Sequence, residues 1–261
     1  MTSPATELLG LSSRWTAVWL RNFLVWRKLA GPAILGNLGE PLLYLLALGY
    51  GFGALVGEVH GLDYIVFLAS GIVCASAMNT ASFETMYSAY TRMAVQHTWE
   101  GILTAPLGIG DVALGEVVWA ASKGLLSAAA ILLVAALLGA VQGWAALWAL
   151  PVVFLLGLAF ASMAMVMTAV AMNYDFFLYY VTLVLTPMFL LSGVFFPLDA
   201  MPALIQQAAW VLPLTHGVAV VRPLMTELPL GAVWPHLLVV AAYALAAYAL
   251  AVVLLRRRLL R

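Results

Sequence analysis

Long apolar runs separate the few charged side chains of this sequence, and this pattern limits the folds that the chain can adopt. A helical run of about 20 apolar residues is long enough to cross the hydrocarbon core of a bilayer. Only 8% of the residues are charged, whereas about a quarter of the residues in a soluble domain are charged. The sequence therefore predicts an all-α integral membrane protein and excludes an ordinary soluble domain.

Six of the apolar runs are predicted to be membrane spans. They cover residues 34–56, 64–87, 111–140, 147–171, 176–196 and 234–255. With both ends of the chain inside, one basic residue, Arg222, falls in an outer segment, and nine fall in cytoplasmic segments. The nine are Arg14, Arg21, Arg27, Lys28, Arg92, Arg256, Arg257, Arg258 and Arg261. Because basic loops stay in the cytoplasm, we expect a multi-pass membrane protein with both termini cytoplasmic.

Residues 8–28 are predicted to form an amphipathic helix that lies in the plane of the inner membrane surface. Trp15 and Trp19 lie on its apolar side, and basic residues recur every seven positions on another side, at Arg14, Arg21 and Lys28. Such helices insert their apolar face at the headgroup boundary and attract anionic lipid. Two interpretations stay open here: a topogenic segment, or a guard at the point where a lipid-like substrate enters.

One hydrophilic stretch, from Glu84 to Glu116, interrupts the apolar chain. Within it, residues 90–103 have the spacing of a short helix that is partly embedded in a polar interface. Their polar and interfacial side chains are Arg92, Gln96, His97, Trp99 and Glu100. Pro106 ends this helix, because proline removes a backbone donor. The segment is either an interfacial loop helix or a coupling helix that fits a separate energy-supplying subunit.

A few polar side chains and methionines inside the spans are candidates for a substrate pathway. Glu40 is costly at its depth, so it either serves function or extends to the interface. Asn79, Met163 and Met167 are further candidates, although methionine on a membrane helix more often packs. Glu116 and Lys123 lie seven residues apart on one helix face, and we expect them to tie that helix to its neighbours.

The segment 197–214 predicts a re-entrant pair of half-helices on the outer side. Residues 203–212 would rise only ~15 Å as a helix, about half of the hydrocarbon core. Prolines bound the segment and its short helix, at Pro197, Pro202 and Pro213. Residues 217–223 are then expected to return along the outer surface.

Sequence motifs for chemistry are missing. The chain has no G-x-x-x-x-G-K-[ST] phosphate loop, no H-E-x-x-H motif and one cysteine, Cys74. We therefore expect neither catalysis, nor a metal, nor a cofactor in this polypeptide.

Two motifs carry a resemblance that covers nearly the whole chain. One is the connector Arg92-Met93 … Thr98-Trp99-Glu100-Gly101-Ile102-Leu103-Thr104-Ala105-Pro106-Leu107. The other is the outer motif Leu191-Ser192-Gly193-Val194-Phe195-Phe196-Pro197 … Met201-Pro202 … Leu212-Pro213-Leu214-Thr215-His216. With the basic amphipathic start and six spans, they resemble the type-2 ABC exporter permeases, and among these the NodJ-like branch associated with export of lipo-oligosaccharides.

The resemblance implies a half-transporter of the bacterial inner membrane. It pairs as a homodimer and binds two cytoplasmic ABC ATPase subunits, which carry ATP and Mg. Residues 90–103 match the coupling helix, 8–28 the interface helix, and 197–214 a gate on the outer side. The matched gate residues are Phe195, Phe196, Pro197, Pro202, Pro213 and His216. The expected cargo is an amphiphile and not a nucleic acid.

Other functions remain open at this point. Efflux of hydrophobic drugs is a second transport function. An ion-driven carrier would use Glu40, Glu116 and Lys123, and a membrane-embedded transferase or a purely structural subunit is a further alternative.

Overall fold

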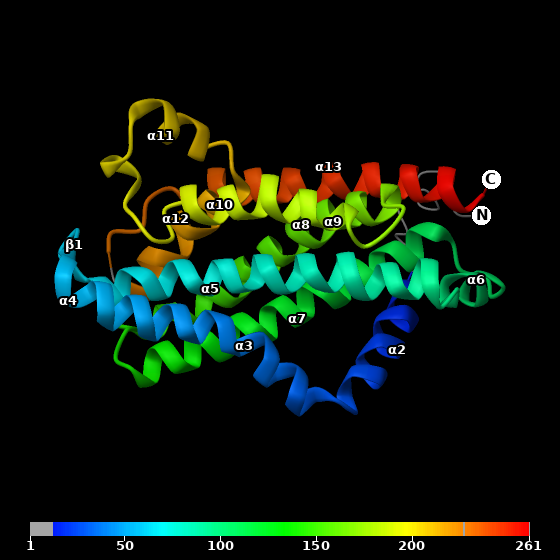
Figure 1. The fold of residues 1–261 in the computed structure, drawn as a ribbon, viewed down its shortest axis with the longest axis horizontal. Helices are drawn as coiled ribbons and strands as arrows, with labels where there is room; N and C mark the ends of the chain where they lie inside the picture. Colours follow the sequence, from blue (N-terminus) through cyan, green and yellow to red (C-terminus); the bar gives the residue numbers. More distant parts are fainter. Residues whose placement is uncertain (1–12, 227, 261) are drawn as a thin grey trace.

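The computed structural model describes residues 13–226 and 228–260, except the side chains of residues 33, 34, 37, 38 and 40. It is an elongated helical bundle (Figure 1). The short helix α6 (Thr98–Leu103) and the C-terminal end of α13 (Val233–Leu259) lie at one end. The strand β1 (Glu58–Val59) lies at the other end.

The first half of the described chain runs from an interface helix to the long helix α7. Its elements are α2 (Trp15–Arg27), α3 (Ala30–Leu46), η1 (Ala47–Phe52), α4 (Gly53–Val56), β1, β2 (Leu62–Asp63), α5 (Tyr64–Phe83), η2 (Glu84–Ala89), η3 (Thr91–Val95), α6 and α7 (Ile109–Leu137). β1 and β2 pair antiparallel, with Glu58 opposite Asp63.

The second half contains two long helices and several short ones. Its elements are η4 (Trp144–Trp148), α8 (Ala149–Val170), α9 (Phe176–Tyr180), η5 (Val181–Leu185), α10 (Thr186–Leu191), η6 (Leu198–Ala200), α11 (Ala203–Ala209), α12 (Pro213–Thr226) and α13. The all-α fold class predicted from the sequence is confirmed, since the two-residue strands are the only extended pairing in the described residues.

Four helical segments in the described residues are long and apolar enough to cross a membrane: Tyr64–Val95, Ile109–Leu137, Trp144–Val170 and Val233–Leu259. The predicted spans 34–56 and 176–196 contain shorter apolar helices, Pro41–Val56 and Phe176–Leu191. The count of six predicted spans is therefore not confirmed. Pro41 interrupts the backbone bonding of α3, and the chain turns away after Leu191, where Gly193 has a positive φ of 76°.

The helix that begins at Tyr64 is longer than predicted and continues to Val95 instead of ending near residue 87. Its last two segments, η2 and η3, are wide π-helical turns. The Thr91 hydroxyl donates to the Tyr87 carbonyl at 2.6 Å, a side-chain bond that competes with regular helix bonding. π-helical turns inside α-helices frequently mark functional sites.

The outer segment differs from the predicted hairpin 197–214. The two short helices α11 and α12 meet at an angle of 88°, and α12 runs on to Thr226. The predicted surface return at 217–223 is wrong, because this stretch is the buried part of α12. A Cβ atom on Gly217 would lie 2.9 Å from Leu156, so α12 packs closely on α8 there.

α5 lies at the centre of the bundle, in contact with α3, α7, α8 and α12. Small residues permit the close approaches: a Cβ on Gly71 would lie 2.8 Å from the Val194 backbone, and one on Gly124 3.0 Å from the Ala77 carbonyl oxygen. Helices in lipid pack through small residues because no hydrophobic force drives them together. This rigid core holds the polar cluster described next.

Candidate functional site

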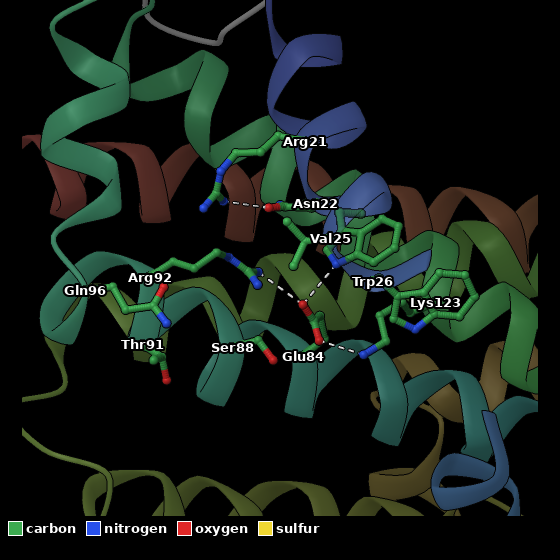
Figure 2. Close-up of a pocket in the computed structure, with 11 residues that line it drawn as sticks. Arg21, Asn22, Val25, Trp26, Glu84, Ser88, Thr91, Arg92, Gln96 and Lys123 are labelled. Atoms are coloured by element: carbon green, nitrogen blue, oxygen red, sulfur yellow. Dashed lines mark hydrogen bonds and ion pairs between the residues drawn. The ribbon is translucent and has the colours of Figure 1, made fainter. Parts of the chain in front are cut away.

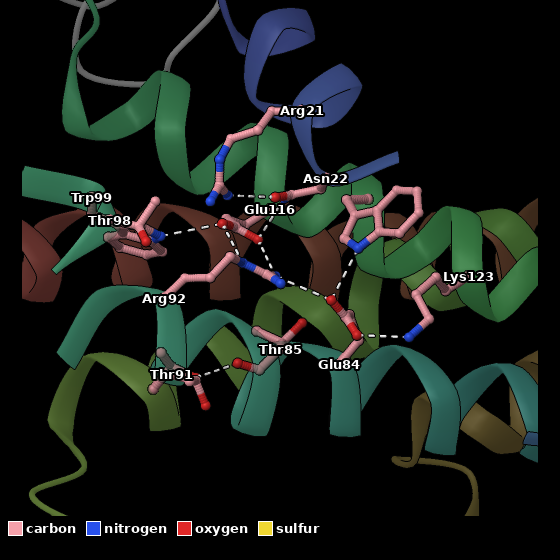
Figure 3. Close-up of polar contacts among 12 residues, drawn as sticks. Arg21, Asn22, Glu84, Thr85, Thr91, Arg92, Thr98, Trp99, Glu116 and Lys123 are labelled. Atoms are coloured by element: carbon pink, nitrogen blue, oxygen red, sulfur yellow. Dashed lines mark hydrogen bonds and ion pairs between the residues drawn. The ribbon is translucent and has the colours of Figure 1, made fainter. Parts of the chain in front are cut away.

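Four charged side chains form a continuous ion-pair network at the end of the bundle that carries α6 (Figure 3). Arg92 lies between two carboxylates: its Nε donates to Glu116 Oε1 at 3.0 Å, and its Nη2 donates to Glu84 Oε1 at 3.1 Å. Lys123 Nζ donates to Glu84 Oε2 at 2.8 Å. Glu116 and Lys123 are thus connected through Arg92 and Glu84, which matches their expected role of tying α7 to its neighbours.

Neutral donors complete the bonding of both carboxylates. Trp119 Nε1 donates to Glu84 Oε1 at 2.9 Å. Glu116 accepts from Asn22 Nδ2 at 2.9 Å and from Trp99 Nε1 at 3.2 Å. Glu116 is 1% exposed and Glu84 6% exposed. Buried carboxylates are tolerable only when they are paired and hydrogen-bonded, and here both conditions are met by four elements: α2, η3, α6 and α7.

The connector does not form the single helix predicted for 90–103. The chain reverses at His97, whose φ is 52°, so that η3 ends at Val95 and α6 begins at Thr98. This turn divides the predicted coupling residues into two sets. Arg92 and Trp99 point into the network, whereas the side chains of Gln96, His97 and Glu100 are exposed.

The interface helix is shorter in the described residues than predicted: α2 covers Trp15–Arg27, and residues 8–12 of the predicted helix lie outside the described residues. α2 packs on α7 at Gly115, where a Cβ would lie 2.6 Å from Val18 Cβ. Trp19 Nε1 donates to Ser122 Oγ at 3.1 Å. The aromatic rings of Trp19, Phe23 and Trp26 surround Trp119 at centroid distances of 6.3, 6.3 and 5.9 Å.

The basic side of α2 is not uniform. The Arg14 guanidinium donates to the Pro106 carbonyl in the connector, and Lys28 is exposed. Arg21 turns toward the network and donates to Asn22 Oδ1 at 3.0 Å. The basic side of the predicted helix therefore contacts the connector through Arg14 and lines a cavity through Arg21.

Two cavities adjoin the network. The first has a volume of about 350 Å³ and lies between α2, η2, η3 and α7 (Figure 2). Its lining comprises Arg21, Asn22, Val25, Trp26, Glu84, Ser88, Thr91, Arg92, Gln96, Trp119 and Lys123. The second, of about 320 Å³, is lined on α3 and α5 and shares Glu84, Ser88 and Lys123 with the first. Together they form a polar strip beside α5.

The predicted pathway residues do not converge on one site. Asn79 lines the second cavity. Met163 and Met167 are partly buried against the hydrophobic core and line neither cavity. Glu40 lies in α3, but its side chain is outside the described part of the structure. The packing interpretation of the methionines therefore accounts for their position.

The predicted gate residues lie together around η6, α11 and α12, far along the bundle from the network. Phe195 is buried against Phe189 at a ring distance of 4.7 Å, whereas Phe196 is 51% exposed. Pro197 precedes η6, Pro202 precedes α11 and Pro213 begins α12. His216 is buried and bonds the Trp210 carbonyl oxygen at 2.9 Å and His236 Nδ1 at 2.8 Å.

Sequence reasoning missed Asn22, Glu84 and Trp119 as members of the cluster. Asn22 had a detectable signal, since Arg21 and Asn22 are the only polar residues between Ala17 and Trp26 in the predicted interface helix. Trp119 had none, because indole donors are common in membrane helices. In the part of the chain that the structure describes, no group of three or more His, Cys, Asp and Glu residues is placed to hold a metal.

Comparison with known proteins gives the family. Residues 13–226 match the family model described as ABC-2 type transporter. The chain is 49% identical to nodulation protein J of Rhizobium leguminosarum bv. trifolii over 98% of both chains. It is 49% identical to nodulation protein J of Bradyrhizobium diazoefficiens over 95% of this chain and 94% of that protein. It is 22% identical to the inner membrane transport permease YadH of Escherichia coli, over 81% and 80%. The chain therefore belongs to the ABC-2 type transporter family, as a membrane permease.

Proposed function

We propose that this permease exports an amphiphilic substrate across the bacterial inner membrane and is driven by ATP hydrolysis on a separate subunit. The observation that carries the proposal is the bond from Trp99 in α6 to Glu116 in α7. It joins a turn with an exposed outer surface to a buried network that reaches two long membrane helices. Force applied to α6 would therefore act directly on the spans.

The exposed side of the connector is the proposed contact for the ABC ATPase. Gln96, His97 and Glu100 lie on it, and His97 Nδ1 and Glu100 Oε1 are 2.8 Å apart. The permease has no phosphate loop, so ATP and Mg belong to the partner. Permease and ATPase would assemble as two copies of each, since C2 pairing is the commonest closed arrangement and two copies can enclose a path.

Closure of the ATPases would move α6, and the network would carry that motion in two directions. Through Glu116 it reaches Asn22 of the interface helix α2. Through Arg92 it reaches Glu84, Lys123 and the wide helical turns below α5. Movement of α2 away from η2 and η3 would open the first cavity toward the membrane surface, where an amphiphile arrives.

The surfaces that adjoin the cavities support this substrate class. Their linings combine charged and hydroxyl groups with indole and phenol rings, and the surrounding helices are apolar. A lipo-oligosaccharide or glycolipid has both kinds of surface, and the high identity to nodulation protein J over nearly the whole chain supports the same branch. The alternative cargo is a hydrophobic drug. Drug resistance gained on expression of the permease, with glycolipid export unchanged, would favour this alternative.

An ion-driven carrier is less well supported by the geometry. Both carboxylates of the network are paired with cations and hold hydrogen bonds from indoles or an amide. Both carboxylates therefore already have partners within the protein, as expected of a structural network. Transport by the reconstituted permease that needs a pH gradient and no ATPase would select the carrier instead.

The test uses two matched pairs of residues. The double variant His97→Ala with Glu100→Ala removes an exposed His–carboxylate pair on the connector. The control, His60→Ala with Asp199→Ala, removes an exposed pair with a separation of 3.0 Å at the opposite end. We expect only the connector variant to lose ATPase copurification and substrate-stimulated ATP hydrolysis. Equal ATPase binding by both variants would refute the coupling assignment.

A further inference from the structure

The described charges around the first cavity do not balance. Three cations, Arg21, Arg92 and Lys123, meet two carboxylates, Glu84 and Glu116, which leaves one positive charge in excess. Glu84 pairs with Arg92 and Lys123, and Glu116 pairs with Arg92. Arg21 forms no ion pair with any described carboxylate. Its Nη1 donates instead to the neutral Asn22 Oδ1 (Figure 2).

The Arg21 guanidinium is in a place that favours an incoming anion. Burial lowers its pKa from the ordinary value, the negative charge of Glu116 opposes that change, and the positive charge of Arg92 adds to it. An arginine stays protonated at neutral pH even so. The cavity therefore holds a partly desolvated cation beside a second cation, and a bound anion would relieve both costs.

The cavity holds a second hydrogen-bond donor, the indole of Trp26. Trp26 lines the cavity, and its buried Nε1 has no hydrogen-bond acceptor among the residues that the structure describes. An indole nitrogen can only donate, and the guanidinium carries five donors and no acceptor. Both groups thus require a ligand rich in acceptor oxygens, and the charge-assisted bonds to an anion are the stronger kind.

Exposed apolar side chains lie beside the cavity, on α2 and just after it. Val25 lines the cavity and is 57% exposed, Leu24 on the same helix is 40% exposed, and Leu29, which follows α2, is 66% exposed. The volume of about 350 Å³ exceeds the roughly 30 Å³ that a water molecule takes up in the liquid by an order of magnitude. The cavity is therefore large enough for a headgroup, and an acyl chain would meet the exposed apolar side chains beside it.

We propose that this cavity binds the anionic headgroup, a phosphate or sulfate ester, of an amphiphile at the inner membrane surface. The proposal rests on the proposed function only in placing this end of the bundle at the cytoplasmic leaflet. The bound molecule is either an anionic lipid of the membrane or the exported cargo itself, because both present the same chemistry to Arg21 and Trp26.

The experiment measures lipid retention by the full-length permease with its ATPase. The complex is placed in nanodiscs of phosphatidylcholine with a minor share of phosphatidylglycerol of the same acyl chains, and retained lipid is counted by native mass spectrometry. We expect Arg21→Gln to weaken phosphatidylglycerol retention by about tenfold or more, as for loss of a charge-assisted bond. Trp26→Phe should weaken it less, because it removes one neutral donor.

Arg27→Gln is the matched control, because Arg27 is exposed on the same helix and the charge change is identical. It should leave retention within about twofold, as expected for a surface charge. Arg21→Gln leaves two described cations facing two carboxylates, so an unchanged melting temperature is expected. Equal losses in Arg21→Gln and Arg27→Gln, or no preference for phosphatidylglycerol over phosphatidylcholine, would overturn the proposal.

Export assays then distinguish the two sources of the headgroup. Loss of both retention and export in Arg21→Gln assigns the site to the cargo, and loss of retention alone assigns it to a membrane lipid. The connector variant His97→Ala with Glu100→Ala should lose ATPase binding and keep lipid retention. A failure of the proposed function is therefore separable from a failure of this site.

Discussion

Arg92 is the residue on which the polar network depends, because it is the one described cation that bonds both carboxylates. Its side chain is 15% exposed. Without it, Glu84 keeps its ion pair with Lys123, but the hydrogen bonds left to Glu116 come only from the neutral Asn22 and Trp99. Removing one partner of a buried ion pair leaves a charge with uncompensated desolvation, which is the costly case.

We therefore expect Arg92→Gln to destabilise the permease by about 3–5 kcal/mol, measured as a lower denaturation midpoint in detergent. The double variant Arg92→Gln with Glu116→Gln should recover part of the loss, because it also removes the unpaired carboxylate. Arg27→Gln serves as the surface control. A midpoint unchanged by Arg92→Gln would mean that the network does not hold these elements together.

Sequence reasoning found most of the residues of this site but assigned some of them to the wrong surface. Arg92 and Trp99 have the spacing of an interfacial helix, and both were expected to lie either in an interfacial loop helix or on the surface that contacts a partner subunit. Their real neighbours are 24 and 17 residues away along the chain, at Glu116. Periodicity reports local geometry only, so it could not show that the left-handed turn at His97 directs both side chains inward.

At the scale of elements, the interface helix α2 packs very closely on α7. At Gly115, a Cβ would lie 2.6 Å from Val18 Cβ and 2.7 Å from the Trp15 carbonyl oxygen. Backbone atoms cannot move aside as a flexible side chain can. Any side chain at this position must therefore displace α2.

We expect Gly115→Ala to separate α2 from α7 and expose Ser122, which Trp19 covers. The measurement is the rate of thiol labelling at Ser122→Cys, which should rise several-fold in the Gly115→Ala background. Gly31→Ala is the control, because its Cβ would meet nothing within 4 Å. The same labelling rate in both backgrounds would show that α2 accommodates the methyl group. Native Cys74 is buried and should not react with the thiol reagent.

The turn between α10 and η6 depends on one cation from α12. Arg222 Nη2 donates to the Gly193 carbonyl oxygen at 2.7 Å, and Arg222 Nε donates to Ser70 Oγ at 3.0 Å. Its guanidinium also lies 3.7 Å from the centre of the Phe67 ring. These contacts join three elements at the predicted gate.

Arg222→Lys should destabilise this turn by about 1–3 kcal/mol, because an ammonium group cannot make the forked bonds and the flat ring contact together. The change is measured as faster proteolysis or hydrogen exchange around residues 192–200, with exchange at α6 as the internal control. Uniform exchange across both regions would contradict a local role for Arg222.

The long helices could be predicted because about twenty apolar residues between polar segments have one stable arrangement in lipid. The short elements could not be predicted in this way. Residues 217–223 carry an arginine and were placed on the surface, but the partners of that arginine come from α5 and the α10–η6 turn. When the hydrogen-bond acceptors of a cation lie far away in the sequence, the residues next to that cation do not reveal that it is buried.

For the whole molecule, the two ends of the bundle make a testable contrast. Glu100 in α6 and Arg257 near the end of α13 are exposed at one end, and His60 and Asp199 are exposed and paired at the other. The distribution of basic residues predicts that the first end faces the cytoplasm.

An impermeant thiol reagent applied to whole spheroplasts should label His60→Cys and Asp199→Cys. Glu100→Cys and Arg257→Cys should react only after the membrane is opened. The reverse pattern would invert the topology and place the proposed ATPase contact outside the cell.

The left-handed backbone at His97 sets the direction of the connector. At a φ of 52°, a glycine or an asparagine is comfortable, whereas a β-branched residue such as valine is strongly disfavoured. Straightening this single joint would let the wide helix run on past Val95 and swing Trp99 out of its indole–carboxylate bond. Under the proposed function, replacing this one side chain would therefore change which face of the connector meets the ATPase and would disconnect that face from Glu116.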